Sequence, residues 1–238
     1  MSLYTSLSGM MVHLFRQDVT ANNIANINTT GFKSSRAETQ ENAGTGGAHT
    51  AATSRSTDQG AFMQTGRNMD MAVEGRGFFP LVTASGTRAY TRDGTFHVDR
   101  DGNIVTSGGY RLDANITIPQ GTQSLRISPD GDVYALTHGS TIPKRLGRIE
   151  LVNFFNPQGL NSIGNNFYAQ TTASGPAIMG LPGSNGFGQI LSGALETSNT
   201  DIVREMTDMI INQRGMEVNL KAVQTNDRLL GMLLDLKK

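Results

Sequence analysis

The feature that most constrains this chain is a long amphipathic pattern near its C-terminus, from about Ser198 to Leu236. Apolar side chains recur there at alternating steps of three and four residues, which predicts a helix whose stripe packs against other helices. The stretch contains no proline, and the segment 198–201 has residues that favour a helix N-cap. The predicted packing positions are Met206, Met209, Gln213, Met216, Leu220, Val223, Asp227, Leu230 and Leu234, of which Gln213 and Asp227 are polar.

The length of this helix limits what can cover it. About 38 residues at a rise of ~1.5 Å give ~57 Å, against the ~30 Å width of a small domain. The rest of the chain cannot bury so long a stripe, so either the far end frays or other subunits cover it. A core helix with a loose tail is the plainer interpretation, but the sustained spacing favours partner helices.

The N-terminal segment repeats the pattern. It predicts a second helix from about Leu3 to Ile27, ended by a segment in which Gly31 can adopt a positive φ. Asparagines are frequent near its end although asparagine has a modest helix propensity. They either cap a frayed last turn or make specific hydrogen bonds to another helix. The predicted packing positions are Leu3, Leu7, Met10, Leu14, Ala21 and Ile24.

The sequence between the two helices predicts β-structure. Residues 39–60 are rich in Gly, Ala, Thr and Ser without a period, which indicates a linker or flexible loop. Beyond them, Asp-Gly turns at 93–94, 101–102 and 130–131 separate short apolar runs, as in antiparallel sheets. Residues 156–188, rich in Gly, Asn, Ser and Pro, are expected to be irregular. Strands are expected at 69–73, 78–82, 96–98, 103–105, 116–118, 125–127, 133–136 and 148–154.

The predicted fold class is therefore α+β. Long N- and C-terminal helices pair as a coiled coil, and an antiparallel β-rich domain is inserted between them. The predicted boundaries are 1–38 and 190–238 for the helical domain, 39–60 for the linker and 61–189 for the β-rich domain.

Composition argues against several classes of function. Lys+Arg and Asp+Glu are both 20, so the formal net charge is zero, unlike that of a dedicated nucleic-acid binder. The absence of cysteine excludes disulfides, thiol nucleophiles and cysteine-ligated metals. No apolar run approaches the ~18 residues that span a membrane, so no lipid insertion is expected. No classical signal peptide is visible, which fits a cytosolic protein or one exported without a cleaved signal.

No catalytic, cofactor-binding or metal site is predicted. The four histidines lie far apart and lack the spacing of metal ligands. Asp93, Asp101 and Asp130 each precede a glycine, so a role in turns outweighs acid–base catalysis. The glycine clusters at 44–47 and 75–77 do not match a P-loop.

The segment 21–33, ANNIANINTTGFK, resembles the N-terminal signature of bacterial flagellar axial proteins, which form the rod, the hook and the hook-associated structures. The segment 35–38 narrows the resemblance to the basal-body rod proteins, closest to the distal type. Further matches at 64–79, 90–96, 156–168, 192–199 and 213–214 follow almost the whole chain. The signature residues are Asn22, Asn23, Asn26, Asn28, Thr29, Gly31 and Phe32.

Two departures keep the proximal rod proteins, or a diverged rod or hook paralogue, as the alternative. The linker at 39–60 is shorter than in many distal rod proteins. Gly215 and Met216 stand where that family usually has alanine and an aromatic residue.

The resemblance implies a structural subunit and not an enzyme. In this family the terminal helices of many copies pack as coiled-coil layers around a channel, and the hollow rod passes through the periplasm and transmits motor torque to the hook. The implied partners are copies of the chain, other rod proteins, the hook, the surrounding ring proteins and the flagellar type III export apparatus, which needs no cleaved signal peptide. Two other hypotheses are a cytosolic ligand-binding module or enzyme with helical oligomerisation arms, and a secreted adhesin.

Overall fold

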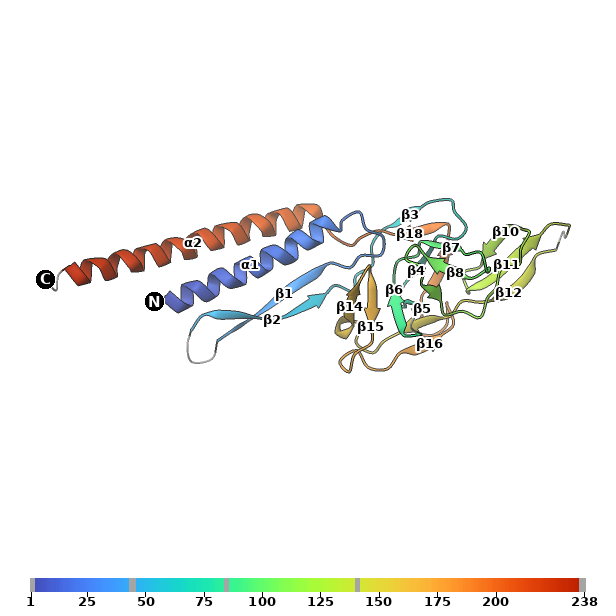
Figure 1. Ribbon diagram of the computed structural model, residues 1–238, viewed down its shortest axis with the longest axis horizontal. Coiled ribbons are helices and arrows are strands. Elements are labelled where there is room, and N and C mark those ends of the chain that lie inside the picture. Colours follow the sequence, from blue (N-terminus) through green and yellow to red (C-terminus); the bar gives the residue numbers. More distant parts are fainter. Residues whose placement is uncertain (1–2, 43–45, 84–85, 140–141, 236–238) are drawn as a thin grey trace. The chain divides into compact units, whose positions relative to one another are not determined.

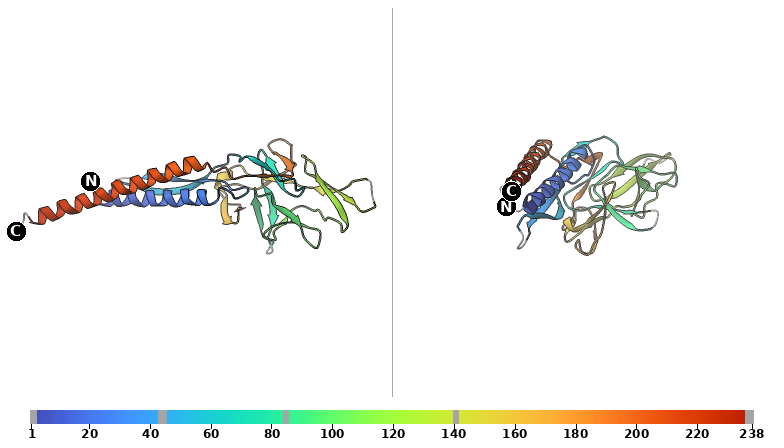
Figure 2. Two further views of the ribbon diagram at one scale, coloured as in Figure 1. Left: turned by 90° about the horizontal axis from the view of Figure 1, so that it is seen from above. Right: turned by 60° about the vertical axis from the view of Figure 1, so that its left-hand side comes forward.

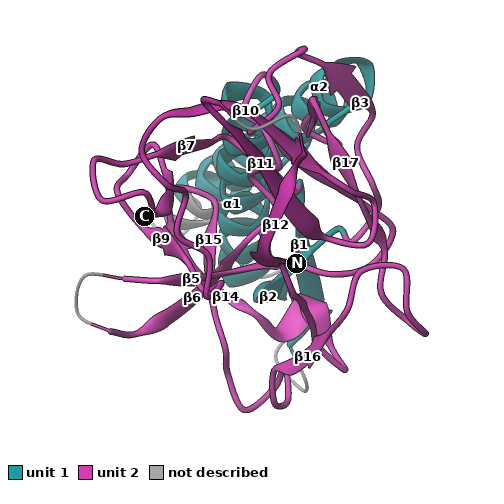
Figure 3. Ribbon diagram, turned by 90° about the vertical axis from the view of Figure 1, so that its right-hand side faces the viewer, with its two compact units in different colours: residues 1–27, 34–56, 200–238 teal, residues 28–33, 57–199 magenta. Residues whose placement is uncertain are grey.

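The computed structural model describes residues 3–42, 46–83, 86–139 and 142–235, with the backbone alone at 230 and 233–235 (Figure 1). The chain divides into two compact units (Figure 3). Unit 1 comprises residues 1–27, 34–56 and 200–238, and unit 2 comprises residues 28–33 and 57–199. Each unit is therefore assembled from segments that lie far apart in the sequence.

Two antiparallel helices dominate unit 1 (Figures 1 and 2). Helix α1 spans Leu3–Ala25 and helix α2 spans Ile202–Asp235, and the two pack side by side. Asp201 caps α2, because its carboxylate accepts hydrogen bonds from the backbone N–H groups of Val203 (2.9 Å) and Arg204 (3.4 Å). At ~1.5 Å per residue α2 is ~51 Å long and α1 ~35 Å, so α2 extends beyond its partner. Both predicted helices are confirmed.

A β-hairpin completes unit 1. Strand β1 (Ser35–Glu41) pairs antiparallel with β2 (Ala48–Arg55), although the sequence predicted an irregular linker over most of this stretch. The hairpin lies against α1, where the Arg16 guanidinium donates to Thr39 Oγ1 at 2.8 Å and the Ala48 amide donates to Ser8 Oγ at 3.3 Å. The two strands consist of polar and charged residues and alanine, so the sequence shows no alternation of large apolar residues to reveal them. The centre of the Gly44–Gly47 cluster lies outside the described residues.

Unit 2 is built from short antiparallel strands. Its largest sheet has seven strands in the order β14-β15-β6-β5-β9-β8-β7. A second sheet joins β10, β11 and β12, and three two-stranded pairs join β13 with β16, β17 with β4, and β18 with β3. The strands are β3 (Phe62–Gln64), β4 (Met71–Glu74), β5 (Phe79–Val82), β6 (Arg88–Thr91), β7 (Phe96–Val98), β8 (Ile104–Thr106), β9 (Arg111–Leu112), β10 (Thr122–Ile127), β11 (Asp132–Thr137), β12 (Lys144–Arg148), β13 (Leu151–Asn153), β14 (Asn161–Gly164), β15 (Phe167–Ala169), β16 (Ile178–Gly180), β17 (Gln189–Ser192) and β18 (Ala194–Glu196), and a 3-10 turn lies at Pro157–Gly159.

The core of unit 2 is apolar and partly aromatic. Its main cluster includes Met71, Phe79, Leu81 and Phe96, and the rings of Phe79 and Phe96 meet edge to face with centroids 5.3 Å apart. A smaller cluster surrounds Phe154. The described part of the chain contains no helix that is long and apolar enough to cross a membrane.

Three expectations for unit 2 need correction. The run Ile116–Ile118 is extended chain outside the sheets, although both isoleucines are buried. Residues 156–188 are not wholly irregular, because buried Phe167 lies in β15 at the large sheet. Residues 190–196, assigned to the helical domain, form the strands β17 and β18 in unit 2, which bury Ile190 and Leu195.

Candidate assembly surface

Both helices of unit 1 expose large apolar side chains. On α2 these include Met206 (51 % exposed) and Leu220 (48 %), and on α1 Leu7 and Leu14 are also about half exposed. A helix in water normally turns such residues toward a partner. The exposed apolar residues of the two helices are Leu3, Tyr4, Leu7, Met11, Leu14, Ile202, Val203, Met206, Ile210, Ile211, Val218, Leu220, Leu229 and Met232.

The predicted packing positions differ in their exposure. Gln213 and Asp227 are exposed, while Met209, Met216 and Val223 are half-buried. On α1, Met10 and Ile24 are half-buried, and Leu3, Leu7, Leu14 and Ala21 are exposed. The side chains of Leu230 and Leu234 lie outside the described residues.

Polar and small residues also lie between the two helices. Asn212, one position before the predicted Gln213, is buried and faces His13. Asn23 donates through Nδ2 to Glu205 Oε1 at 3.0 Å. The sequence pattern therefore identified an apolar stripe that the described part of the chain covers only in part.

The signature asparagines organise the end of α1. Asn23 is buried, its side-chain amide donates to the Ser35 carbonyl at 2.8 Å, and its side-chain oxygen accepts from the Ser35 amide at 2.9 Å. The Asn22 carbonyl accepts from both the backbone N–H (3.2 Å) and the side chain (2.9 Å) of Asn26. These contacts combine both roles considered for the asparagines, since the Asn26 side chain caps a carbonyl of the last turn and Asn23 contacts α2.

The rest of the signature belongs to unit 2. Gly31 has a φ of 67° and donates its amide to the Glu196 carbonyl at 2.8 Å. Phe32 accepts a hydrogen bond at its carbonyl from the Asn199 amide at 3.4 Å. Asn28 is exposed and Thr29 is half-buried. The segment 28–33 thus docks beside the chain that leaves β18.

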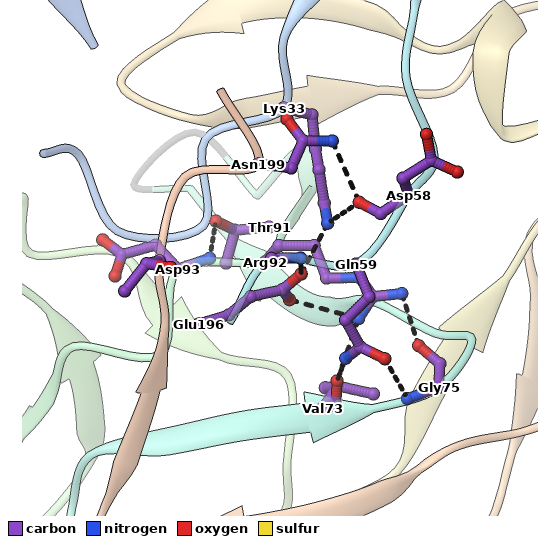
Figure 4. A network of polar contacts seen from close by, with 12 residues as sticks. Lys33, Asp58, Gln59, Val73, Gly75, Thr91, Arg92, Asp93, Glu196 and Asn199 are labelled. Carbon is purple, nitrogen blue, oxygen red and sulfur yellow. Dashed lines mark hydrogen bonds and ion pairs between the residues drawn. The ribbon is translucent and has the colours of Figure 1, made fainter. Parts of the chain in front are cut away.

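A buried charge cluster in unit 2 holds this segment, and no sequence pattern predicted it (Figure 4). The Glu196 carboxylate accepts from Lys33 Nζ at 2.5 Å, from the Gly60 amide at 2.9 Å and from Arg92 Nη1 at 3.4 Å. Lys33 Nζ also donates to the Asp58 carbonyl at 2.7 Å. All three charged side chains are buried.

Electrostatics within the cluster follow from burial and pairing. Burial lowers the pKa of Lys33, and the neighbouring Glu196 carboxylate opposes that change. Burial likewise lowers the pKa of Arg92, again opposed by Glu196. The Arg92 guanidinium also lies over the Phe78 ring, 5.2 Å from its centroid. The cluster joins the segments 31–33, 58–60 and 196–199 at one place.

The described residues include no group of three or more His, Asp or Glu side chains that could hold a metal ion. The buried Glu196 is fully engaged by two cations and an amide, which suits a structural contact and not proton transfer. The features that need a functional explanation are thus the exposed apolar side chains of α1 and α2 and the signature segment 28–33, which the charge cluster holds in place.

Comparison with known proteins supplies a functional explanation for these features. The family profile described as flagella basal body rod protein matches residues 3–33, the flagellar hook protein FlgE/F/G D1 domain matches 72–135, and the flagellar basal body rod FlgEFG protein C-terminal profile matches 191–236. The flagellar basal-body rod protein FlgG of Borreliella burgdorferi is 41% identical over 100% of this chain and 98% of its own length. The FlgG protein of Caulobacter vibrioides is 39% identical over 96% of this chain and 96% of its own length. The FlgG protein of Bacillus subtilis is 38% identical over 100% of this chain and 99% of its own length.

The chain belongs to the FlgG family of flagellar basal-body rod proteins. It is a structural subunit of the basal body of the flagellum and not an enzyme, as the resemblance implied. The FlgG relatives align over more positions than the 238 residues of this chain, so they carry insertions relative to it.

Proposed function

We propose that this FlgG-family chain self-assembles through its terminal helices into a hollow distal rod that transmits motor torque to the hook. The exposed apolar side chains of α1 and α2 carry this proposal. Between Leu3 and Met232 they form a surface that the described part of the chain leaves in water. Fully burying an exposed apolar side chain contributes roughly 1.5–3 kcal/mol. Covering these partly exposed side chains contributes a part of that for each, which favours further copies that cover them.

The finer parts of this function are proposed on the same basis. The partners are copies of this chain, other rod proteins and the hook, whose family shares the central profile. Ring proteins around the rod and the flagellar type III export apparatus are proposed as transient or peripheral partners. We also propose that the rod lies in the periplasm. We further propose that α1 and α2, the helices of the predicted domain 1–38 and 190–238, face the axis, and that the β-rich residues 61–189 lie outside. Most of the predicted linker 39–60 forms the hairpin of β1 and β2 in unit 1. The positions predicted from the periodicity, including Gln213 and Asp227, are proposed to face other copies.

The test replaces apolar side chains on α2 without disturbing unit 2. In bacteria that lack their own FlgG, Met206→Gln with Leu220→Gln is expected to abolish rod completion and motility, since both side chains are about half exposed in the single chain. The matched control is Ile163→Gln with Ile178→Gln, which removes two equally exposed isoleucines (51 % and 53 %) from unit 2. Basal bodies isolated from both strains are imaged by electron microscopy. Normal rods from the α2 variant would overturn the proposal, and so would equal loss in the control.

A further inference from the structure

The contact between α1 and α2 includes polar residues at positions that are usually apolar in a helix pair. Three α2 residues spaced seven apart, Glu205, Asn212 and Asn219, point toward α1. A heptad step keeps residues on one side of a helix, so these three form one stripe. Leucines ordinarily occupy such positions, whereas here the polar residues alternate with half-buried Met209, Met216 and Val223 on the same face of α2.

Each member of the stripe meets a specific residue of α1. Glu205 accepts from Asn23 at 3.0 Å, and Asn212 Oδ1 lies 3.4 Å from His13 Nδ1. Asn219 reaches a glycine, because a methyl group added at Gly9 would lie only 3.0 Å from the Asn219 amide nitrogen. The stripe therefore meets α1 at three positions along the helix.

Residues of both helices are buried or closely packed where α1 meets this stripe. Asn23 is only 2 % exposed and Asn212 only 5 %. The His13 ring lies against Gly215, where an added methyl group would approach it to 2.4 Å. A slip of one residue would remove the carboxylate from Asn23 and place a larger side chain against Gly9. Buried polar groups without their partners cost free energy, so such a slip is disfavoured.

We propose that Glu205, Asn212 and Asn219 form a polar ladder that fixes the register of α2 against α1 of the same chain. Polar residues at heptad core positions specify register and partner at a cost in stability. An apolar helix stripe of another copy cannot satisfy the ladder, so the ladder keeps α1 as its partner. The apolar stripes then stay available for other copies, and only this last consequence rests on the proposed rod function.

A distance measurement on the single chain tests the ladder. Because the sequence has no cysteine, the exposed residues Asp18 and Lys221 can be replaced by cysteine and spin labelled selectively. Pulsed electron paramagnetic resonance then gives the distribution of distances between α1 and α2. The labelled chain with its ladder unaltered is expected to give one narrow peak in this distance distribution. Asn212→Leu with Asn219→Leu is expected to add populations displaced by about 10 Å, the length of one heptad of helix.

The controls separate register from added hydrophobicity. Thr207→Leu with Thr225→Leu adds two leucines to exposed positions of the same helix and should keep the single peak. Glu205→Gln retains an acceptor for Asn23 and should also keep it. If circular dichroism shows that the double variant loses helix, Asn212→Leu alone is measured.

Two results would overturn the ladder. One is a single unshifted peak in the leucine variant, and the other is a broad distribution in the unaltered ladder or in the threonine control. Rod formation is not read in this experiment, so a failure here leaves the proposed function intact.

Discussion

At the scale of single residues, Glu196 is expected to dominate the stability of unit 2. Glu196→Gln leaves Lys33 and Arg92 buried without an anion, which should cost about 3–5 kcal/mol. Lys33→Met leaves one balanced pair, Arg92 with Glu196, and should cost less, about 1.5–3 kcal/mol for a lost charged hydrogen bond. Urea unfolding followed by tyrosine fluorescence measures both, since the sequence has no tryptophan and four of its five tyrosines lie in unit 2. A larger loss from the lysine variant would contradict this account.

Gly31 gives a second prediction at this scale. Its φ is 67°, and an added Cβ would lie 2.6 Å from the backbone of Arg92 and Asp93. Gly31→Ala therefore adds a steric clash to the roughly 1–2 kcal/mol cost of left-handed backbone. Gly66 is the matched control, because its φ is 72° and no atom lies within 4 Å of the added methyl group. In the same unfolding assay Gly66→Ala should show only the backbone cost, and equal losses for the two glycines would refute the clash.

At the scale of the helices, Glu205 makes the pair sensitive to pH. Burial raises its pKa, and repulsion from Asp208 adds to this, while the hydrogen bond from Asn23 and the charges of Arg204 and Arg36 oppose it. A carboxyl whose pKa is raised on folding stabilises the fold below its unfolded pKa, and this contribution is lost as pH rises through the folded pKa. Amide exchange across α1 and α2, corrected for intrinsic rates, should therefore show greater protection at roughly pH 4 than at pH 7. Glu205→Gln should remove this component, and an unchanged pH dependence in that variant would assign it to other groups.

The elements also show what the sequence could reveal. The helices, the Asp101-Gly102 hairpin between β7 and β8 and the antiparallel β-domain were predictable because local periodicity and turn chemistry specify them. The apolar stripe was visible on α2, but periodicity cannot show what covers a stripe. The chain places polar Asn212 against α1 and leaves Gln213 exposed, a difference of one residue that only the contacts reveal. The hairpin of β1 and β2 escaped prediction because its support comes from α1 and not from its own apolar residues.

For the whole molecule, the least predictable feature is how distant segments combine. Lys33 and Glu196 are 163 residues apart, and nothing local to either residue marks them as a pair. The family signature has residues in both units, since Asn23 belongs to unit 1 and Gly31 belongs to unit 2. Its resemblance to rod proteins thus identified the family correctly, although the physical roles of its residues needed the structure.

The division into two units leads to the last prediction. Leu220 lies within α2, where proline removes a helical hydrogen bond and clashes with the preceding turn, at a cost of ~3 kcal/mol or more. Unit 2 has its own apolar core, so Leu220→Pro should leave its unfolding transition by tyrosine fluorescence nearly unchanged while it abolishes rod assembly and motility. Ile202→Pro is the control, because proline is tolerated at the first position of a helix, and it should spare the fold of α2. If Leu220→Pro also lowered the stability of unit 2, the two units would form one cooperative fold, and α2 would act as part of a common core and not as a separate assembly element.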